Sequence, residues 1–125
     1  MNPLIISASA ESPSVIFNGE SGSFVVSGKS YPENVNDFYK PLFEYLDLYK
    51  KAPKDKTILE FNWIYFNTAT SKIIMKLILN LKEFKGLNKS VEVRWCCKST
   101  DELMIEKGEE IKELIDIDFK IIYEG

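Results

Sequence analysis

The chain has 125 residues, 45% of them apolar and 28% charged, with a formal net charge of -3 at pH 7. This length and composition are typical of one globular domain, neither disordered nor fibrous, and the negative balance provides no broad basic face for nucleic acid. No apolar run is long enough to span a bilayer, so we expect one cytoplasmic domain over residues 1–125 without nucleic-acid binding or membrane insertion.

The first third of the chain predicts three short strands, at residues 4–8, 14–18 and 23–27. The stretch Gly19-Glu20-Ser21-Gly22 lies between the last two strands and is rich in turn-forming residues. Two alternating runs joined by such a turn indicate an antiparallel hairpin.

A helix is predicted next, beginning in the stretch Ser30-Tyr31-Pro32-Glu33-Asn34 and continuing to about Tyr49. Its apolar residues recur at steps of three and four, so they share one face. Either Ser30 or Asn34 serves as the N-cap in this interpretation. Pro41 is expected to kink the helix.

The second half predicts a strand at 57–66, a helix from about Thr70 to Lys85, a strand at 91–97, a third helix and a strand at 117–123. In the first of these strands, alternation places Trp63 and Tyr65 on the same side. A Ser-x-x-Glu capping box at Ser99 is expected to begin the third helix. Within that helix, Gly108 is expected to permit close approach to the sheet.

Alternating strands and helices at this spacing require parallel pairing in the second half. Because several strands keep polar residues on one side, helices are expected to cover mainly the other side. The predicted fold is therefore α/β: a single two-layer domain whose mixed sheet starts with an N-terminal β-hairpin and continues with alternating helices and strands, helices mainly on one face.

Histidine is absent from the chain. This excludes Ser-His-Asp and Cys-His catalytic sites and removes the commonest transition-metal ligand. Cys96 and Cys97 are adjacent in a predicted strand, so they point to opposite faces and form neither a metal clamp nor an ordinary disulfide. We expect partly buried, reduced thiols, no metal site and no cofactor.

Hydroxyl groups are concentrated where the strand at 57–66 gives way to the next helix: Thr68, Thr70 and Ser71 follow Asn67 within four residues. Open α/β sheets bind ligands at this carboxyl edge. Helix capping by Thr68, Thr70 or Ser71 is one interpretation, yet a single residue suffices for a cap. A functional site is the other, and both stay open at this point.

Three functions compete for these hydroxyls. A phosphate-cradling loop needs glycines, and none lies between Gly28 and Gly86. A nucleophile elbow needs small residues and a base, which the segment does not supply. A phosphoacceptor needs only an accessible hydroxyl, because the kinase brings the catalytic groups.

Several stretches also resemble a known family. These are Ser12-Pro13-Ser14-Val15, Gly28-Lys29-Ser30-Tyr31-Pro32-Glu33-Asn34, Tyr65-Phe66-Asn67-Thr68-Ala69-Thr70-Ser71-Lys72 and residues 101–110. Together they are similar to the SiaC family of bacterial regulatory phosphoproteins, over nearly the whole chain.

The resemblance implies a non-enzymatic signalling adaptor in which Thr68 is phosphorylated by a SiaB-like threonine kinase and restored by a SiaA-like PP2C-type phosphatase. It further implies that the unmodified form binds and activates a SiaD-like diguanylate cyclase that controls cyclic-di-GMP and biofilm formation. Partner-binding candidates are Asn67, Thr70, Ser71, Lys72, Tyr31, Glu33 and Asn34. The alternatives are a small enzyme or nucleotide-binding protein using the junction at 67–72, and an interaction module without a switch.

Overall fold

The computed structural model describes residues 1–85 and 88–124. In chain order its elements are β1 (Leu4–Ile6), β2 (Ser14–Asn18), β3 (Ser23–Ser30), α1 (Val35–Tyr49), β4 (Lys56–Phe66), α2 (Thr68–Lys85), β5 (Ser90–Cys97), α3 (Glu102–Leu114) and β6 (Asp118–Tyr123). The strands form one sheet in the order β1-β2-β3-β4-β5-β6. Strands β1 to β3 pair antiparallel, and the remaining neighbours pair parallel. This confirms the predicted mixed sheet with its N-terminal hairpin.

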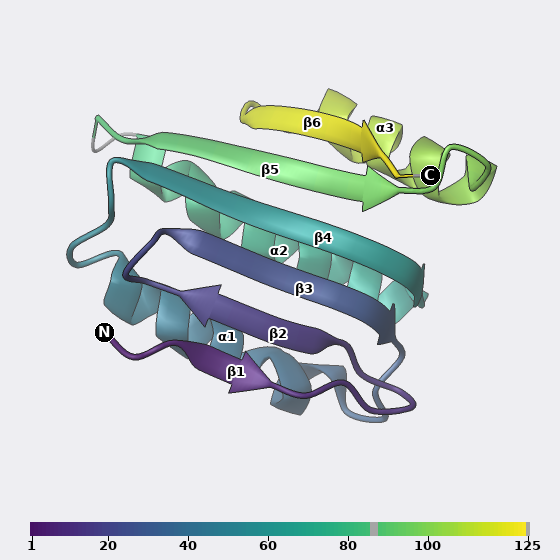
Figure 1. Cartoon of the computed structure of the whole chain (residues 1–125), viewed down its shortest axis with the longest axis horizontal. Helices are drawn as coiled ribbons and strands as arrows, with labels where there is room; N and C mark the ends of the chain where they lie inside the picture. The colour runs from purple at the N-terminus through teal and green to yellow at the C-terminus, as the bar shows by residue number, and fades with distance from the viewer. Residues whose placement is uncertain (86–87, 125) are drawn as a thin grey trace.

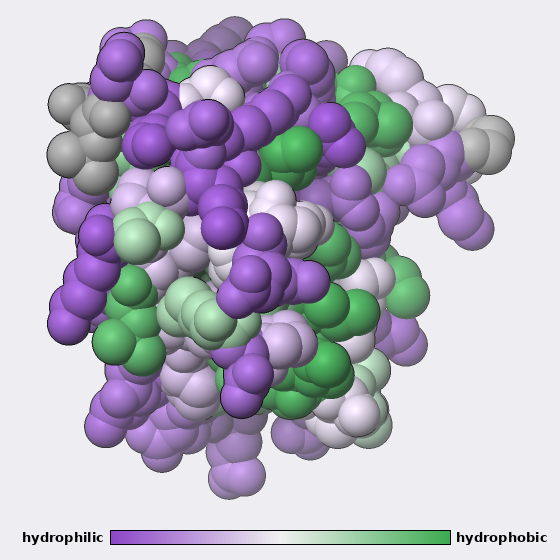
Figure 2. All heavy atoms as spheres, turned by 60° about the vertical axis from the view of Figure 1, so that its left-hand side comes forward, coloured by the Kyte–Doolittle hydropathy of each residue, from purple (hydrophilic) through white to green (hydrophobic). Residues whose placement is uncertain are grey.

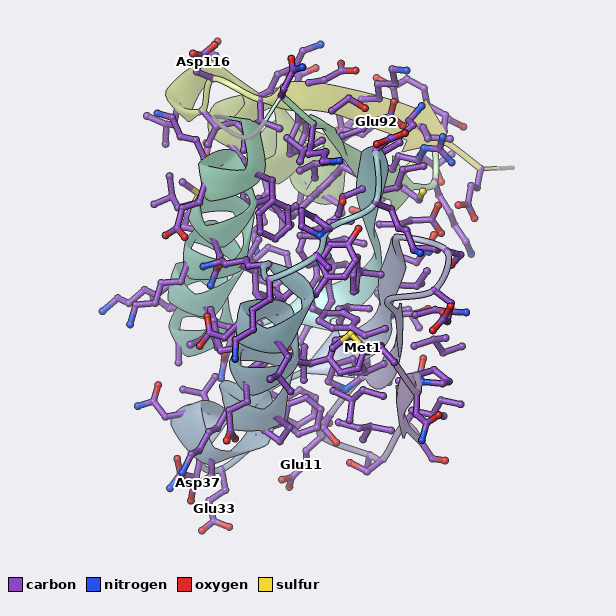
Figure 3. All side chains as sticks on the ribbon, turned by 90° about the vertical axis from the view of Figure 1, so that its left-hand side faces the viewer. Met1, Glu11, Glu33, Asp37, Glu92 and Asp116 are labelled. Carbon is purple, nitrogen blue, oxygen red and sulfur yellow. The ribbon has the colours of Figure 1, made fainter. Side chains whose placement is uncertain are left out.

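The helices lie behind the sheet in Figure 1, α1 behind β1 to β3, α2 behind the central strands and α3 behind β5 and β6. Seen end-on in Figure 3, the helices are on one side of the sheet, and within residues 1–85 and 88–124 no helix covers the other side. The two-layer arrangement with helices on one face is therefore as predicted.

The core fills the space between the sheet and the helices. Phe17 and Phe24 meet edge to face on β2 and β3, with ring centroids 5.0 Å apart, and Phe61 and Trp95 make a similar contact between β4 and β5 at 5.7 Å. Such contacts fix ring orientation as well as burying apolar area. The α2 residues that are fully buried against them are Ile74, Leu77, Ile78, Leu81 and Phe84.

Helix α1 begins where Asn34 caps it: the Asn34 side chain accepts a hydrogen bond of 3.2 Å from the Asp37 amide. This decides between the two predicted caps, because Ser30 instead ends β3 and is buried. Pro41 lies within the helix, which is continuous from Val35 to Tyr49.

Helix α3 approaches β5 closely at Gly108. A Cβ atom there would lie 2.6 Å from Trp95 Cδ1, so the position has no room for a side chain. Trp95 Nε1 also donates a hydrogen bond of 3.0 Å to the Met104 carbonyl, which fixes the helix over the strand. The expected close approach at Gly108 is confirmed.

The N-cap of α3 is Asp101, whose carboxylate accepts a 3.1 Å hydrogen bond from the Met104 amide. The predicted capping box at Ser99 is therefore wrong. Since Asp101 stands directly before the first helical residue, Glu102, its carboxylate is placed to satisfy an orphan amide of the first turn.

The open face of the sheet contains a nearly buried acid. Glu92 is 2% exposed, and its carboxylate accepts hydrogen bonds from Lys120 Nζ at 2.9 Å and from Arg94 Nε, with Lys56 Nζ 3.8 Å away. Figure 3 shows Glu92 at the sheet, away from the helices. The hydrogen bond from Lys120, reinforced by Arg94, lowers the pKa of Glu92 from 4.5 to about 2, although burial opposes this.

The other half of the open face is apolar. Ile5 of β1 lies opposite Ile16 of β2, which lies opposite Val25 of β3. Ile5 and Ile16 remain largely exposed, and Figure 2 shows hydrophobic atoms gathered on this lower part of the sheet. The face is thus divided between an apolar half and a half with paired charges.

Candidate functional site

A β-bulge near the carboxyl end of β4 changes which side chains point outward. Gly28 on β3 is opposite Trp63, whereas the next residue, Lys29, is opposite Tyr65, so Ile64 is the extra residue. The shift places Phe66 in the core and leaves Tyr65 exposed. The prediction that Tyr65 shares the buried side with Trp63 is therefore wrong, because strict alternation ends at the bulge.

Helix α2 starts directly after this strand, with Asn67 as its N-cap. The Asn67 side-chain oxygen accepts a 2.9 Å hydrogen bond from the Thr70 amide, and its carbonyl accepts one of 3.0 Å from the Ser71 amide. The helix therefore begins at Thr68, two residues before the predicted start. None of the three hydroxyl residues proposed as caps is the N-cap.

The Thr70 hydroxyl points into the protein. Thr70 is 0% exposed, and its Oγ1 donates to the Ser30 carbonyl at 3.1 Å and lies 2.9 Å from Ser30 Oγ. Ser30 Oγ is in turn 2.7 Å from the Tyr39 hydroxyl, and burial raises the pKa of Tyr39 to about 12. This network ties β3, α1 and α2 together, so Thr70 has no surface to offer a partner.

The Thr68 hydroxyl lies on the opposite side of the same turn. Thr68 is exposed, and within residues 1–85 and 88–124 no group hydrogen-bonds its side chain. Ser71, by contrast, donates its hydroxyl to the Thr68 carbonyl at 2.7 Å. Of the three hydroxyls at this junction, the Thr68 hydroxyl is both accessible and unused.

Thr68 lines a pocket of about 410 Å³ between the start of α2 and the outer side of α3. One wall comes from the β4–α2 junction: Tyr65, Phe66, Asn67, Thr68, Ser71 and Met75. The α3 wall consists of Lys107, Glu110, Ile111 and Leu114. We call this cavity the α2–α3 pocket.

The α3 wall was not predicted to be part of the site. Lys107 Nζ lies 4.3 Å from the centroid of the Phe66 ring, and Leu114 is 74% exposed. Their placement depends on Gly108, which lets α3 approach the sheet. In the sequence, Lys107 and Glu110 lie in the stretch 101–110 that resembles the family, and Ile111 and Leu114 are apolar at a helical spacing of three.

The other partner-binding candidates differ in exposure and in their position relative to the α2–α3 pocket. Tyr31 is exposed and meets Tyr65 edge to face, with ring centroids 5.9 Å apart, so these two aromatic side chains lie together. Glu33 is exposed near the start of α1, as Figure 3 shows, and Asn34 is used as a cap. Lys72 is exposed on α2 but does not line the α2–α3 pocket.

Both cysteines are buried and free, as predicted. Burial raises the pKa of Cys96 to about 12 and also raises that of Cys97. A thiol whose pKa is raised forms little of the reactive thiolate, so neither side chain is activated for redox chemistry.

Two broader features concern the described part of the chain. Across 1–85 and 88–124, no three His, Cys, Asp or Glu side chains form a group that holds a metal ion. In the same residues, no helix has the length and apolar character needed to cross a membrane.

Solved structures with this fold come from Pseudomonas aeruginosa. Apo-SiaC is 23% identical and superposes with a TM-score of 0.89, covering 98% of this chain and 99% of that one. A second structure, the diguanylate cyclase SiaD in complex with its activator SiaC, matches with 24% identity and a TM-score of 0.89 over 97% and 99% of the two chains. These likenesses show the same fold.

Sequence comparison leads to the same group of proteins. An uncharacterised protein of Pseudomonas aeruginosa (strain UCBPP-PA14) is 24% identical over 121 residues, which are 97% of this chain and 96% of that protein. The family described as SiaC family regulatory phosphoprotein matches residues 6–124. Because this match spans nearly the whole chain, the protein belongs to the SiaC family of regulatory phosphoproteins.

Proposed function

We propose that this chain is a signalling adaptor switched by reversible phosphorylation of Thr68, and that its unphosphorylated form binds and activates a diguanylate cyclase. The observation that carries the proposal is the Thr68 hydroxyl, which is exposed and unbonded at the edge of the α2–α3 pocket. Family membership and the SiaD–SiaC complex of the related protein support the same function.

The covalent step is phosphoryl transfer from ATP held by a SiaB-like threonine kinase. Thr68 Oγ1 attacks the γ-phosphorus, the bond to the β,γ-bridging oxygen breaks, ADP leaves, and a base of the kinase takes the hydroxyl proton. A SiaA-like PP2C-type phosphatase reverses the modification with water: the phosphorus–Oγ1 bond breaks, inorganic phosphate leaves, and the threonine hydroxyl is reprotonated. The adaptor itself needs no catalytic group for either step.

Phosphorylation adds about -1.5 to -2 charges and three acceptor oxygens at Thr68. Thr68 is the first residue of α2, where the positive end of the helix dipole partly accommodates the charge, so we expect the fold to survive the modification. A partner that occupies the α2–α3 pocket instead meets bulk and a charge it cannot pair. We expect a penalty of ~1–3 kcal/mol, or about 5- to 150-fold in affinity.

The proposed contact surface combines the α2–α3 pocket with the exposed Tyr31–Tyr65 pair. Exposed aromatic and aliphatic side chains beside an accessible polar residue are typical of protein interfaces. Asn67 and Ser71 line the same pocket and complete the candidates. Thr70 is left out because it is buried.

The acceptor is tested by incubating purified wild-type chain, Thr68→Ala and Thr70→Ala with a SiaB-like kinase and ATP, and then mapping phosphate by mass spectrometry. We expect phosphate on Thr68 in the wild type and in Thr70→Ala, and none in Thr68→Ala. Phosphate mainly on Thr70 or Ser71 would overturn the assignment.

The adaptor role is tested by measuring binding and cyclase activity with a SiaD-like diguanylate cyclase. Thr68→Ala is expected to bind and activate like the unphosphorylated wild type, and Thr68→Glu to bind less tightly. Binding indifferent to Thr68→Glu and to phosphorylation would instead indicate an interaction module without a switch. Turnover of a nucleotide by the purified chain alone would indicate an enzyme.

A further inference from the structure

We infer that Lys107 is the internal counter-charge of phosphorylated Thr68, and that the ion pair between them closes the α2–α3 pocket. The inference rests on the proposed function for the presence of the phosphate. It adds a second element to the switch: a lysine of the same chain that holds the phosphate across the site that the partner would use.

Lys107 is held in the pocket without a carboxylate partner. Its Nζ lies 4.3 Å from the Phe66 ring centroid, and no Asp or Glu among residues 1–85 and 88–124 lies within ion-pair distance of it. Glu110, three residues further along α3, is the acid at ion-pairing spacing, and it too is not paired with Lys107 in the described chain. The ammonium group is therefore available to an anion that arrives in the pocket.

A phosphate on Thr68 is such an anion. A lysine over an aromatic ring at a partly exposed site gains only about 0.5–1 kcal/mol from that contact, whereas charge-assisted hydrogen bonds to phosphate are stronger. Lys107 and Thr68 line the same pocket from opposite walls, and the lysine side chain is long and flexible. We therefore expect the Lys107 side chain to exchange the Phe66 ring for the phosphate.

The backbone of α3 is held in place for this exchange. Gly108, the residue after Lys107, lies against the Trp95 ring, and Trp95 Nε1 is hydrogen-bonded to the Met104 carbonyl one turn earlier. These contacts fix the base of the Lys107 side chain relative to the sheet. The ion pair therefore links two rigid helices across the pocket opening.

Glu110 is the charged group that opposes this arrangement. It lines the same pocket as Lys107 and Thr68, and a carboxylate near a phosphate disfavours the dianion. Lys112 is exposed on α3 outside the pocket lining, whereas Lys72 follows Thr68 by one turn of α2 and is the rival counter-charge. Together these residues provide one variant that should strengthen the interaction and one matched lysine that should not affect it.

The experiment uses the full chain with phosphothreonine installed at position 68 by genetic encoding, so that no kinase is needed. The ³¹P resonance is titrated with pH in the wild type and in Lys107→Gln, Lys107→Arg, Lys112→Gln, Lys72→Gln and Glu110→Gln. Because an opposite charge favours the dianion, we expect the titration midpoint to be about one pH unit lower in the wild type than in Lys107→Gln. Lys107→Arg and Lys112→Gln should titrate like the wild type, and Glu110→Gln at still lower pH.

Equal midpoints in the wild type and Lys107→Gln would overturn the inference, as would a rise caused by Lys72→Gln alone. Lys107→Arg keeps the charge, so a midpoint like that of Lys107→Gln would also contradict it. The installed phosphate separates the two proposals. A kinase that leaves Thr68 unmodified refutes the proposed function, whereas equal midpoints refute only the role of Lys107.

Discussion

Thr68 and Thr70 are two residues apart in the first turn of α2, yet their surroundings are opposite. Thr70 is 0% exposed and hydrogen-bonded to Ser30, whereas Thr68 is exposed and its hydroxyl is unbonded in the described chain. A helix has 3.6 residues per turn, so positions i and i+2 point to nearly opposite sides. Chemically identical side chains therefore serve folding on one side and remain available for modification on the other.

The same division recurs on α3. Gly108 is buried against Trp95 with no room for a side chain, while the adjacent Lys107 lies over the Phe66 ring and has no carboxylate partner among the described residues. In both helices the residues that hold the fold are buried, whereas Thr68 and Lys107 line the α2–α3 pocket. Different residues, close together in the chain, thus stabilise the fold and serve the proposed switch. Single substitutions can test the two roles separately.

Gly108→Val should lower the free energy of unfolding more than any of the other substitutions discussed. The added side chain overlaps the Trp95 ring, and we expect a loss of about 3 kcal/mol in the free energy of unfolding, the upper end of typical overpacking costs. Urea denaturation followed by tryptophan fluorescence measures it. Glu109→Ala, at the exposed position next to it, is the control, and equal stability of the two variants would contradict the role of Gly108.

Glu92→Gln should cost about 2 kcal/mol at pH 7, because the variant loses its ion pairs with Lys120 and Arg94. The folded-state pKa of Glu92 is lowered from 4.5 to about 2. Its contribution is therefore fully present above pH 4.5 and is lost as the pH falls towards 2. Unfolding free energies across this range should decline less steeply in Glu92→Gln, and parallel curves would refute the assignment.

Thr70→Val should cost about 1–2 kcal/mol, because a nearly isosteric side chain removes the hydroxyl and leaves the buried Ser30 hydroxyl with one partner fewer. Chemical denaturation measures the loss. The kinase should still modify Thr68 in this variant, so the effect belongs to folding alone. Unchanged stability would mean that the hydroxyl network adds nothing to the fold.

Thr68→Val is the matched change on the outer side and should have the smallest effect on stability, within about 0.5 kcal/mol of the wild type. It should nevertheless abolish phosphate incorporation. The pair Thr70→Val and Thr68→Val thus sharpens the comparison, since each should alter one property and leave the other intact. A destabilisation by Thr68→Val as large as that by Thr70→Val would remove the distinction.

The periodicity of apolar residues was sufficient to predict the order of the helices and strands and their arrangement in two layers. Alternating apolar residues located β2, β4 and β5 to within a residue or so, because burial of one face imposes that spacing. Gly108 was also interpreted correctly from its position on the apolar face of α3. These features depend on local pattern and on packing that the pattern dictates.

The details of the site depend on tertiary contacts that no local pattern encodes. The exposure of Tyr65 follows from a bulge between β3 and β4, which exists only once both strands are paired. Asn67, rather than a hydroxyl residue, is the cap because β4 ends at Phe66 and α2 begins at Thr68. Lys107 follows Thr68 by some forty residues in the chain. It reaches the site because α3 packs on β5.

The spatial order of the strands equals their order in the sequence, and this has a consequence for synthesis on the ribosome. Each new strand pairs with the one made just before it, so no early strand waits for a distant partner. The five-stranded part of the sheet is able to assemble before the last residues emerge, which limits the time that unpaired edges are exposed to aggregation.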